Sequence, residues 1–209
     1  MKENKYDDNI FFQKYSQMSR SQQGLAGAGE WETLRKLLPD FKDKRVLDLG
    51  CGYGWHCIYA MEHGASSVVG VDISHKMLEV AKEKTHFPQV EYKCCAIEDV
   101  EFPEESFDVI LSSLAFHYVA DYEILVKKIY RILKSGGNLV FTVEHPVFTA
   151  YGTQDWHYNE KGEILHFPVD NYYYEGKRTA VFLGEKVTKY HRTLTTYLNT
   201  LLSNGFIIN

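Results

Sequence analysis

The sequence predicts an α/β fold in which a doubly wound, mostly parallel sheet carries helices on both faces. Between residues 43 and 143, segments with the pattern of strands alternate with segments of helical period, which is typical of βαβ units. The segment 107–114 is rich in apolar residues, as expected of a strand buried on both faces. The apolar segment 45–49 is a third indication, because it runs directly into closely spaced glycines and then a helical pattern.

The individual elements follow from these patterns in chain order. An N-terminal segment with helical character covers residues 8–38 and ends near Pro39. Strands are expected at 45–49, 67–72, 90–94, 107–114 and 137–143, and helices at 55–63, 76–84 and 122–133. Ser74 is the expected N-cap of the second helix, and the glycines in the turn 134–137 are expected to end the third.

The alternation stops at Glu144. Residues 144–190 are expected to form a loop-rich, aromatic insertion with short strands over the sheet edge. A helix at about 193–202 follows, and then the start of a strand at 206–208. We therefore expect a single domain whose C-terminal edge strand is incomplete.

Composition excludes several classes of protein. With 209 residues and 44% hydrophobic content, the chain suffices for one well-buried domain. Its net charge of −5, and the lack of any Lys/Arg run longer than Lys127-Lys128, argue against nucleic acid as a partner. The N-terminus has no apolar signal region and no window approaches about 18 uninterrupted apolar residues. We therefore expect a cytoplasmic protein without membrane insertion.

The four cysteines show neither zinc spacing nor a Cys-x-x-Cys pair. We expect them to be reduced and to serve packing. They are Cys51, Cys57, Cys94 and Cys95.

Gly50, Gly52 and Gly54 follow the first strand at a spacing that suits a nucleotide-type cofactor. Glycine allows a sharp turn and the close approach of a ligand, and the next helix points free N–H groups at that ligand. The spacing departs from the dinucleotide fingerprint, which would place the last glycine where Trp55 stands. Asp72, 18 residues after Gly54, is placed to accept hydrogen bonds from two ribose hydroxyls. This fits NAD as well as S-adenosylmethionine, and an Asp that only shapes a turn is the alternative.

Later landmarks distinguish the two cofactors. The segment Ala96-Ile97-Glu98-Asp99 ends the third strand, Ser106-Phe107-Asp108-Val109-Ile110 opens the fourth, and Leu133-Lys134-Ser135-Gly136-Gly137 follows the next helix. With the glycine segment and Asp72, this order over residues 43–143 resembles the class I S-adenosylmethionine-dependent methyltransferases, whose fold is Rossmann-like. It looks closest to the type 11 domain of the small-molecule branch, which includes ubiquinone and menaquinone methyltransferases.

The resemblance implies S-adenosylmethionine as cofactor and S-adenosylhomocysteine as product. It places Asp48 and the glycine segment beside the methionine portion, Asp72 at the ribose, and Ile73 on the adenine ring. Ile97 and Glu98 border the adenine amino group, and the end of the fourth strand lines the sulfonium side. The implied cofactor-binding residues are Tyr15, Asp48, Gly50, Cys51, Gly52, Asp72, Ile73, Ile97, Glu98, Ser113 and Leu114.

Two departures from related branches narrow the implied chemistry. The segment Ser112-Ser113-Leu114-Ala115 replaces the Asn/Asp-Pro-Pro-Tyr sequence of enzymes that methylate the amino groups of adenine or glutamine. The segment Leu111-Ser112-Ser113 offers no acidic Mg²⁺ ligand of the kind that catechol-type enzymes use. We expect metal-independent methyl transfer to a small, aromatic or hydrophobic acceptor. The alternatives are a non-catalytic S-adenosylmethionine-binding domain and an NAD-dependent oxidoreductase.

Two histidines are candidates for the catalytic base that a hydroxyl or acidic-carbon acceptor would need. His117 lies just beyond the carboxyl end of the fourth strand, where open sheets bind ligands, and is the first candidate. A histidine there that only caps backbone groups is the alternative. His145 holds the equivalent place after the fifth strand and is the second candidate.

The remaining candidates concern the acceptor and the flap. Tyr118, Tyr172 and Tyr174 are expected to wall an aromatic acceptor pocket. His191 and Arg192 would bring a base and an anion clamp from the insertion, unless Arg192 is a surface residue.

The N-terminal segment suits a flap over the cofactor, with Tyr15 or Arg20 reaching the methionine carboxylate. An amphipathic helix packed on the sheet is the alternative. The expected parts are thus an N-terminal helical flap (1–42), a cofactor-binding core (43–143), a substrate-side insertion (144–190) and a C-terminal helix with the start of a strand (191–209).

Overall fold

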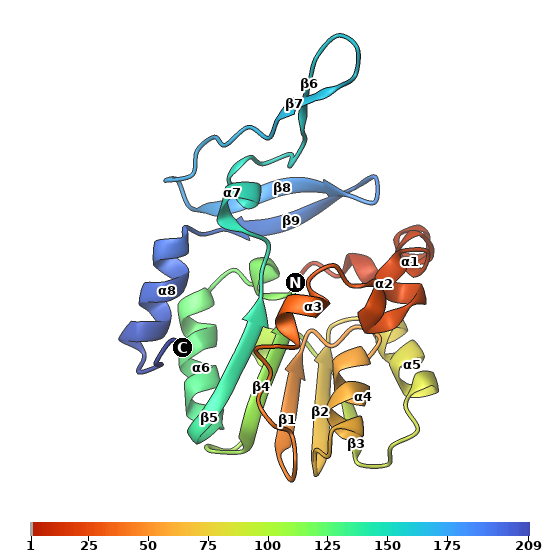
Figure 1. Cartoon of the computed structure of the whole chain (residues 1–209), viewed down its shortest axis with the longest axis vertical. Coiled ribbons are helices and arrows are strands. Elements are labelled where there is room, and N and C mark those ends of the chain that lie inside the picture. The colour runs from red at the N-terminus through yellow and green to blue at the C-terminus, as the bar shows by residue number, and fades with distance from the viewer. Residues whose placement is uncertain (1) are drawn as a thin grey trace.

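The computed structural model describes residues 2–209. A five-stranded parallel sheet with the order β3-β2-β1-β4-β5 lies at its centre (Figure 1). The strands are β1 (Arg45–Leu49), β2 (Ser67–Asp72), β3 (Val90–Cys94), β4 (Phe107–Ser113) and β5 (Leu133–Thr142). Because β1 pairs with both β2 and β4, the direction of winding reverses there, which is where such sheets bind ligands. The predicted fold class is confirmed.

Helices cover both faces of this sheet. They are α4 (Trp55–Glu62), α5 (His75–Lys84), α6 (Tyr122–Ile132) and α8 (Leu194–Ser203). Leu47 packs in a buried cluster with α6 and α8, whereas its neighbour Val46 packs with α4 and α5 on the other face. Ser74 caps α5 as predicted, because its hydroxyl accepts a hydrogen bond from the backbone N–H of Met77 at 3.1 Å. None of the described helices is long and apolar enough to cross a membrane.

The predicted glycine turn does not end α6. The helix ends at Ile132, and Leu133 already pairs as part of β5. Gly136, with a φ of 73°, and Gly137 lie inside β5, where its register with β4 shifts. A Cβ atom on Gly137 would lie 2.9 Å from the carbonyl oxygen of Asp108. The two glycines therefore accommodate an irregular strand pairing instead of a helix cap.

The N-terminal segment is helical, as predicted, but is broken into short pieces. These are η1 (Lys5–Asp7), α1 (Asn9–Ser16), α2 (Ser19–Gln22), η2 (Gly24–Gly27) and α3 (Trp31–Leu34). Gly24 has a φ of 63°, a left-handed value that interrupts regular helix. Figure 1 shows these pieces near the carboxyl ends of β1 and β2, with α4 and α5 beside them.

The insertion between β5 and α8 forms two antiparallel hairpins. Its elements are α7 (Pro146–Ala150), β6 (His157–Tyr158), β7 (Ile164–His166), β8 (Gly176–Phe182) and β9 (Glu185–His191). The β8–β9 hairpin lies across the carboxyl edge of the sheet, and the β6–β7 hairpin extends beyond it (Figure 1). Two short helices, η3 (Ile97–Asp99) and η4 (Phe116–Tyr118), follow β3 and β4.

The prediction of a strand at 206–208 is wrong. These residues follow α8 without forming a strand. The ring of Phe206 instead packs against Tyr130 of α6, with 5.3 Å between ring centroids. Packing against the buried cluster that includes α6 explains the apolar side chain there.

Candidate functional site

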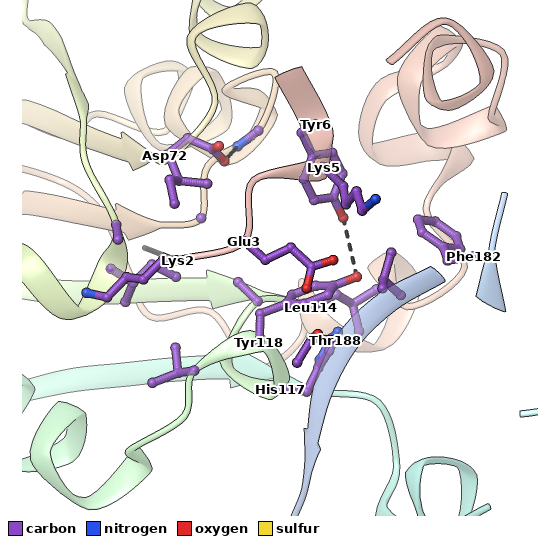
Figure 2. Close-up of a pocket in the computed structure, with 18 of the residues that line it drawn as sticks. Lys2, Glu3, Lys5, Tyr6, Asp72, Leu114, His117, Tyr118, Phe182 and Thr188 are labelled. Carbon is purple, nitrogen blue, oxygen red and sulfur yellow. Dashed lines mark hydrogen bonds between the residues drawn. The ribbon is translucent and has the colours of Figure 1, made fainter. Parts of the chain in front are cut away.

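A cavity of about 550 Å³ lies at the carboxyl ends of β1, β2 and β4 (Figure 2). Its walls come from the N-terminal segment, the loops after these strands, η3, η4 and the β8–β9 hairpin. The predicted site residues that line it are Tyr15, Gly50, Gly52, Asp72, Ile73, Ile97, Glu98, Ser113, Leu114, His117 and Tyr118. The structure therefore brings together residues from five separate parts of the chain.

The three glycines after β1 all have left-handed φ values, but the absence of a side chain does not serve the same purpose at all three positions. A Cβ atom on Gly50 would lie 2.5 Å from that of Ala115, and one on Gly54 would lie 2.2 Å from the hydroxyl oxygen of Tyr92. A Cβ atom on Gly52 would meet nothing within 4 Å. Gly50 and Gly54 are thus required by packing, whereas Gly52 keeps space open on the wall of the cavity.

Asp72 ends β2 and lies beside the glycine loop (Figure 2). Its carboxylate accepts hydrogen bonds at 2.9 Å from the backbone N–H groups of Gly52 and Ser74. Burial raises the pKa of Asp72, and these hydrogen bonds oppose the effect. The bond to Ser74 shapes the turn before α5, so the two roles considered for Asp72 coexist.

Asp48 lies beneath the glycine loop and does not line the cavity. One carboxylate oxygen accepts a hydrogen bond from the Cys57 thiol at 3.5 Å, and the other has no partner among residues 2–209. Burial raises the pKa of Asp48 to about 7. Cys51 lines a smaller adjoining cavity of about 70 Å³.

Tyr15 and Arg20 lie where the two cavities meet. Arg20 forms an ion pair with Glu30, and the same carboxylate accepts a hydrogen bond from the Ser113 hydroxyl at 3.0 Å. The Glu30 carboxylate therefore neutralises the positive charge of Arg20 and also contacts Ser113 at the end of β4.

Contacts that the sequence did not reveal hold the N-terminal segment over the cavity. Asp7 accepts hydrogen bonds from the Ser74 hydroxyl at 2.6 Å and from the backbone N–H of Lys76 at 3.1 Å. Lys2 pairs with Asp99 of η3 at 2.6 Å. The segment thus spans the mouth of the cavity between the ends of β2 and β3. Asp7 and Ser74 lie 67 residues apart in the chain, and Lys2 and Asp99 lie 97 residues apart.

His117 is 2% exposed and lies in η4, directly after β4. Its Nδ1 accepts a hydrogen bond from the backbone N–H of Glu144 at 3.4 Å. Burial lowers the pKa of His117 to about 4, against the opposing effect of the Glu144 carboxylate. The ring is therefore neutral near pH 7. On the same wall, the hydroxyl oxygens of Tyr6 and Tyr118 lie 3.4 Å apart (Figure 2).

Glu144, Gln154 and Lys189 form a network behind His117. The buried ammonium of Lys189 pairs with Glu144 and donates to the side-chain oxygen of Gln154 at 2.9 Å. The amide of Gln154 donates to Glu144 at 2.8 Å. Burial alone would raise the pKa of Glu144, but the Lys189 ammonium and the hydrogen bond from Gln154 hold it below its usual range. Of the three network residues, Glu144 lines the cavity.

The structure does not bring His145 into the cavity. Its side chain is exposed, and its Nδ1 accepts a hydrogen bond from the backbone N–H of Val147 at 3.1 Å. His145 is thus the N-cap of α7, with Pro146 at the first helical position. The prediction of a base at this position is not supported.

The four candidates from the insertion also lie outside the cavity lining. Tyr174 is 73% exposed in a turn that is not a strand, and the hydroxyl of Tyr172 accepts a hydrogen bond from the backbone of Leu194 at 3.1 Å. Arg192 is buried and donates to the backbone carbonyls of Val119 and Ala120. It therefore fixes the end of β9 to the loop after η4 instead of clamping an anion.

His191 is fully buried between two protein groups. Its Nε2 lies 2.8 Å from the carbonyl oxygen of Tyr172, and its Nδ1 lies 2.8 Å from the hydroxyl of Thr149. Since a carbonyl only accepts, Nε2 donates to it and Nδ1 accepts from Thr149. Both ring nitrogens are occupied, so His191 serves the structure of the insertion.

Known proteins share both the landmarks and the fold. The family model for a methyltransferase domain matches residues 47–141. A structure from Listeria monocytogenes, described as a candidate S-adenosylmethionine-dependent methyltransferase, is 58% identical with a TM-score of 0.83, over 87% of this chain and 85% of that one. An S-adenosylmethionine-dependent methyltransferase from Mesorhizobium loti is 41% identical with a TM-score of 0.82, over 89% and 84%.

A ubiquinone biosynthesis O-methyltransferase from Coxiella burnetii is 35% identical over 112 residues. The aligned part covers 53% of this chain and 47% of that enzyme, so the similarity spans about half of each. The matches to the two solved structures cover most of this chain and most of each relative, and both relatives are described as S-adenosylmethionine-dependent. The chain therefore belongs to the S-adenosylmethionine-dependent methyltransferases, which decides between the two cofactors that Asp72 alone left open.

Proposed function

We propose that this enzyme transfers a methyl group from S-adenosylmethionine to a small, aromatic or hydrophobic acceptor without a metal ion. One observation carries the proposal: a single cavity extends from Gly52 at the glycine loop to the apolar side chains of Phe182 and Val187 on the β8–β9 hairpin. A cofactor at the glycine end and an acceptor at the hairpin end would meet in one space. The relative named for ubiquinone biosynthesis supports a small acceptor.

The residues at the glycine end fit the cofactor. Gly52 leaves open space for it, and the Asp72 carboxylate has lone pairs beyond its two backbone hydrogen bonds for the ribose hydroxyls. Ile73 and Ile97 offer apolar surface for the adenine ring. The proposed set also includes Tyr15, Gly50, Cys51, Glu98, Ser113 and Leu114, with Asp48 acting from beneath the loop.

The proposed chemistry requires alignment and the exclusion of water. The bound cofactor supplies an electrophilic methyl group on a positively charged sulfur. The protein has to hold the acceptor in line with that methyl group, and orientation of this kind contributes up to about 7–11 kcal/mol. The N-terminal segment held by Asp7, and the tyrosine pair Tyr6 and Tyr118, would close the cavity to solvent.

The absence of a metal ion is proposed from the side chains available. Ser112 and Ser113 leave the end of β4 without a carboxylate. Residues 2–209 contain no group of three or more His, Cys, Asp or Glu side chains placed to hold a metal. Both observations favour a mechanism that relies on orientation.

A transfer assay tests the proposal. The protein is incubated with S-adenosylmethionine that is radiolabelled in its methyl group and with a panel of phenols, quinols and apolar amines. We expect label in organic-extractable product, both with and without a metal chelator, and none with the Asp72→Ala variant. Label recovered in added protein or nucleic acid alone, or transfer abolished by the chelator, would contradict the proposal.

A further inference from the structure

The ring of His117 has one nitrogen bound to the protein and one free. Figure 2 shows the ring on the cavity wall next to Tyr118, with 4.5 Å between ring centroids. The bound nitrogen is Nδ1, which faces the backbone N–H of Glu144 at 3.4 Å. An N–H group can only donate, so Nδ1 is the acceptor in this contact.

This contact fixes both the ring orientation and the tautomer. A ring turned by 180° would set a C–H group against the N–H of Glu144, so the observed orientation is preferred. A neutral imidazole carries one proton, and Nδ1 has its lone pair engaged. The proton therefore resides on Nε2.

Nε2 is the free nitrogen. It has no hydrogen-bond partner among residues 2–209. It is also absent from the fully buried polar atoms without a partner, so Nε2 retains some exposed surface. Since the His117 side chain lines the cavity, Nε2–H is available to a molecule inside. A nitrogen that already carries the proton donates a hydrogen bond and cannot remove a proton from the acceptor.

Burial keeps the ring of His117 neutral, and the surrounding charges do not reverse this effect. The groups that act on His117 are the Glu144 carboxylate after β5, the Lys189 ammonium on β9 and the Arg192 guanidinium after β9. Glu144 is paired with Lys189 and bonded to Gln154, so its charge is largely compensated. Burial lowers the pKa of His117 to about 4, and the fixed tautomer therefore persists at neutral pH.

We propose that His117 donates a hydrogen bond from Nε2 to an oxygen atom of the methyl acceptor, and that it positions this molecule without acting as a base. The acceptor class is then an apolar molecule that carries an oxygen atom with a free lone pair, such as a hydroxyl, a carbonyl or an oxyanion. This inference rests on the proposed function, because it assumes that the acceptor occupies the hairpin end of the cavity.

Two substitutions distinguish the possible roles. His117→Gln places an amide N–H group near the position of Nε2, whereas His117→Asn places an amide oxygen near Nδ1 and keeps the bond to Glu144. A donor to the substrate predicts that the Gln variant retains at least about a tenth of kcat/KM and that the Asn variant loses more than about tenfold, mainly through KM. A purely structural role predicts the reverse order, and a base predicts that both variants lose kcat. Either of these last results would overturn the proposal.

The tautomer can be measured without any acceptor. Protein with ¹⁵N-labelled histidine, saturated with S-adenosylhomocysteine, is followed by long-range ¹H–¹⁵N correlation between about pH 5 and 8. The His117 signals are assigned in the wild-type protein, through correlations that connect the ring to the assigned backbone of His117. We expect a proton on Nε2 and no titration in this range. A proton on Nδ1, or a titration near neutrality, would overturn the proposal even where the variants fail to fold.

The same samples separate this inference from the proposed function. If S-adenosylhomocysteine binds and methyl transfer occurs but His117 carries its proton on Nδ1, only the donor role fails. If wild-type protein transfers no methyl group to any acceptor of the panel, the proposed function fails, whatever the tautomer of His117.

Discussion

The carboxylate of Asp7 accepts a hydrogen bond from the hydroxyl group of Ser74 at 2.6 Å, although 67 residues separate the two in the chain. Asp7 lies at the first turn of α5, where a negative charge is favoured by the helix dipole. Burial alone would raise the pKa of Asp7, but the bonds from Ser74 and the backbone of Lys76 hold it below its usual range. The N-terminal segment is thus fixed to the loop that follows Asp72.

Asp7→Ala is expected to speed the dissociation of S-adenosylhomocysteine. Hydrogen bonds to a charged group contribute about 1.5–3 kcal/mol, so the dissociation rate should rise about tenfold or more while the association rate stays within a few-fold. Stopped-flow displacement of bound S-adenosylhomocysteine measures both rates.

Asp108→Ala is the matched control. Asp108 accepts hydrogen bonds at 2.9 Å from the backbone of Arg45 and from Lys134, at the amino end of the sheet away from the cavity. Its loss should lower stability without altering ligand kinetics. Equal dissociation rates for the Asp7 variant and wild type would show that the N-terminal segment does not retain the ligand.

Gly52→Ala is expected to weaken ligand binding with little steric cost in the free protein. The added methyl group meets nothing within 4 Å, but it occupies space that the ligand needs. A left-handed alanine costs about 1–2 kcal/mol of stability, so the unfolding temperature should fall somewhat. Calorimetric titration with S-adenosylhomocysteine should show an affinity that is lower by about tenfold or more.

Gly64→Ala provides the comparison for backbone strain. Gly64 has a φ of 87°, and its added Cβ would make an ordinary contact with Lys42 at 3.4 Å. Both alanine variants should lose similar stability, and only the variant at position 52 should lose affinity. A Gly52→Ala protein that binds as well as wild type would remove the glycine loop from the ligand site.

Asp48 makes the stability of the free protein depend on pH. Burial raises its pKa to about 7, above about 3.9 in the unfolded chain. Between these pH values the folded state holds a proton that the unfolded state has released. The contribution of Asp48 to the free energy of unfolding therefore falls as pH rises, and the full loss is reached above about pH 7. The free energy of unfolding of Asp48→Asn, relative to wild type, should therefore rise from about pH 4 to 7 by an amount on the order of a few kcal/mol. Urea unfolding at several pH values measures this difference, and a constant difference would show that Asp48 is ionised in both states.

The parallel core was predictable because its signals are local. The bounds of β1, β2 and β3 agree with the expected ones. β1 and β2 are short, mostly apolar segments, and β3 alternates apolar and charged residues. Gly52 and Asp72 were identified for the same reason, because Gly52 lies in the loop after β1 and Asp72 is the last residue of β2. These positions meet at one edge because parallel strands end there.

The remaining parts of the site depend on contacts between distant residues. No local pattern indicates that Asp7 bonds to Ser74, or that Lys189 lies behind His117 through Glu144. Arg192 looked like a surface cation or an anion clamp, yet it bonds to carbonyl groups 72 and 73 residues away.

One missed assignment had a local signal. Pro146 stands where proline is favoured at the first position of a helix, so His145 before it could have been identified as a cap. By contrast, no local pattern shows that Leu133 begins a strand. Pairing with β4 overrides the helix-ending signal of the glycines that follow.

Titration calorimetry of S-adenosylhomocysteine into wild-type protein and Asp72→Ala tests the location of the cofactor most directly. We expect one site per chain in the wild type and an affinity lower by at least about tenfold in the variant, because the Asp72 carboxylate is the group placed to hold the ribose. Equal affinities for the two proteins, or no binding by the wild type, would contradict the assignment of this cavity as the cofactor site.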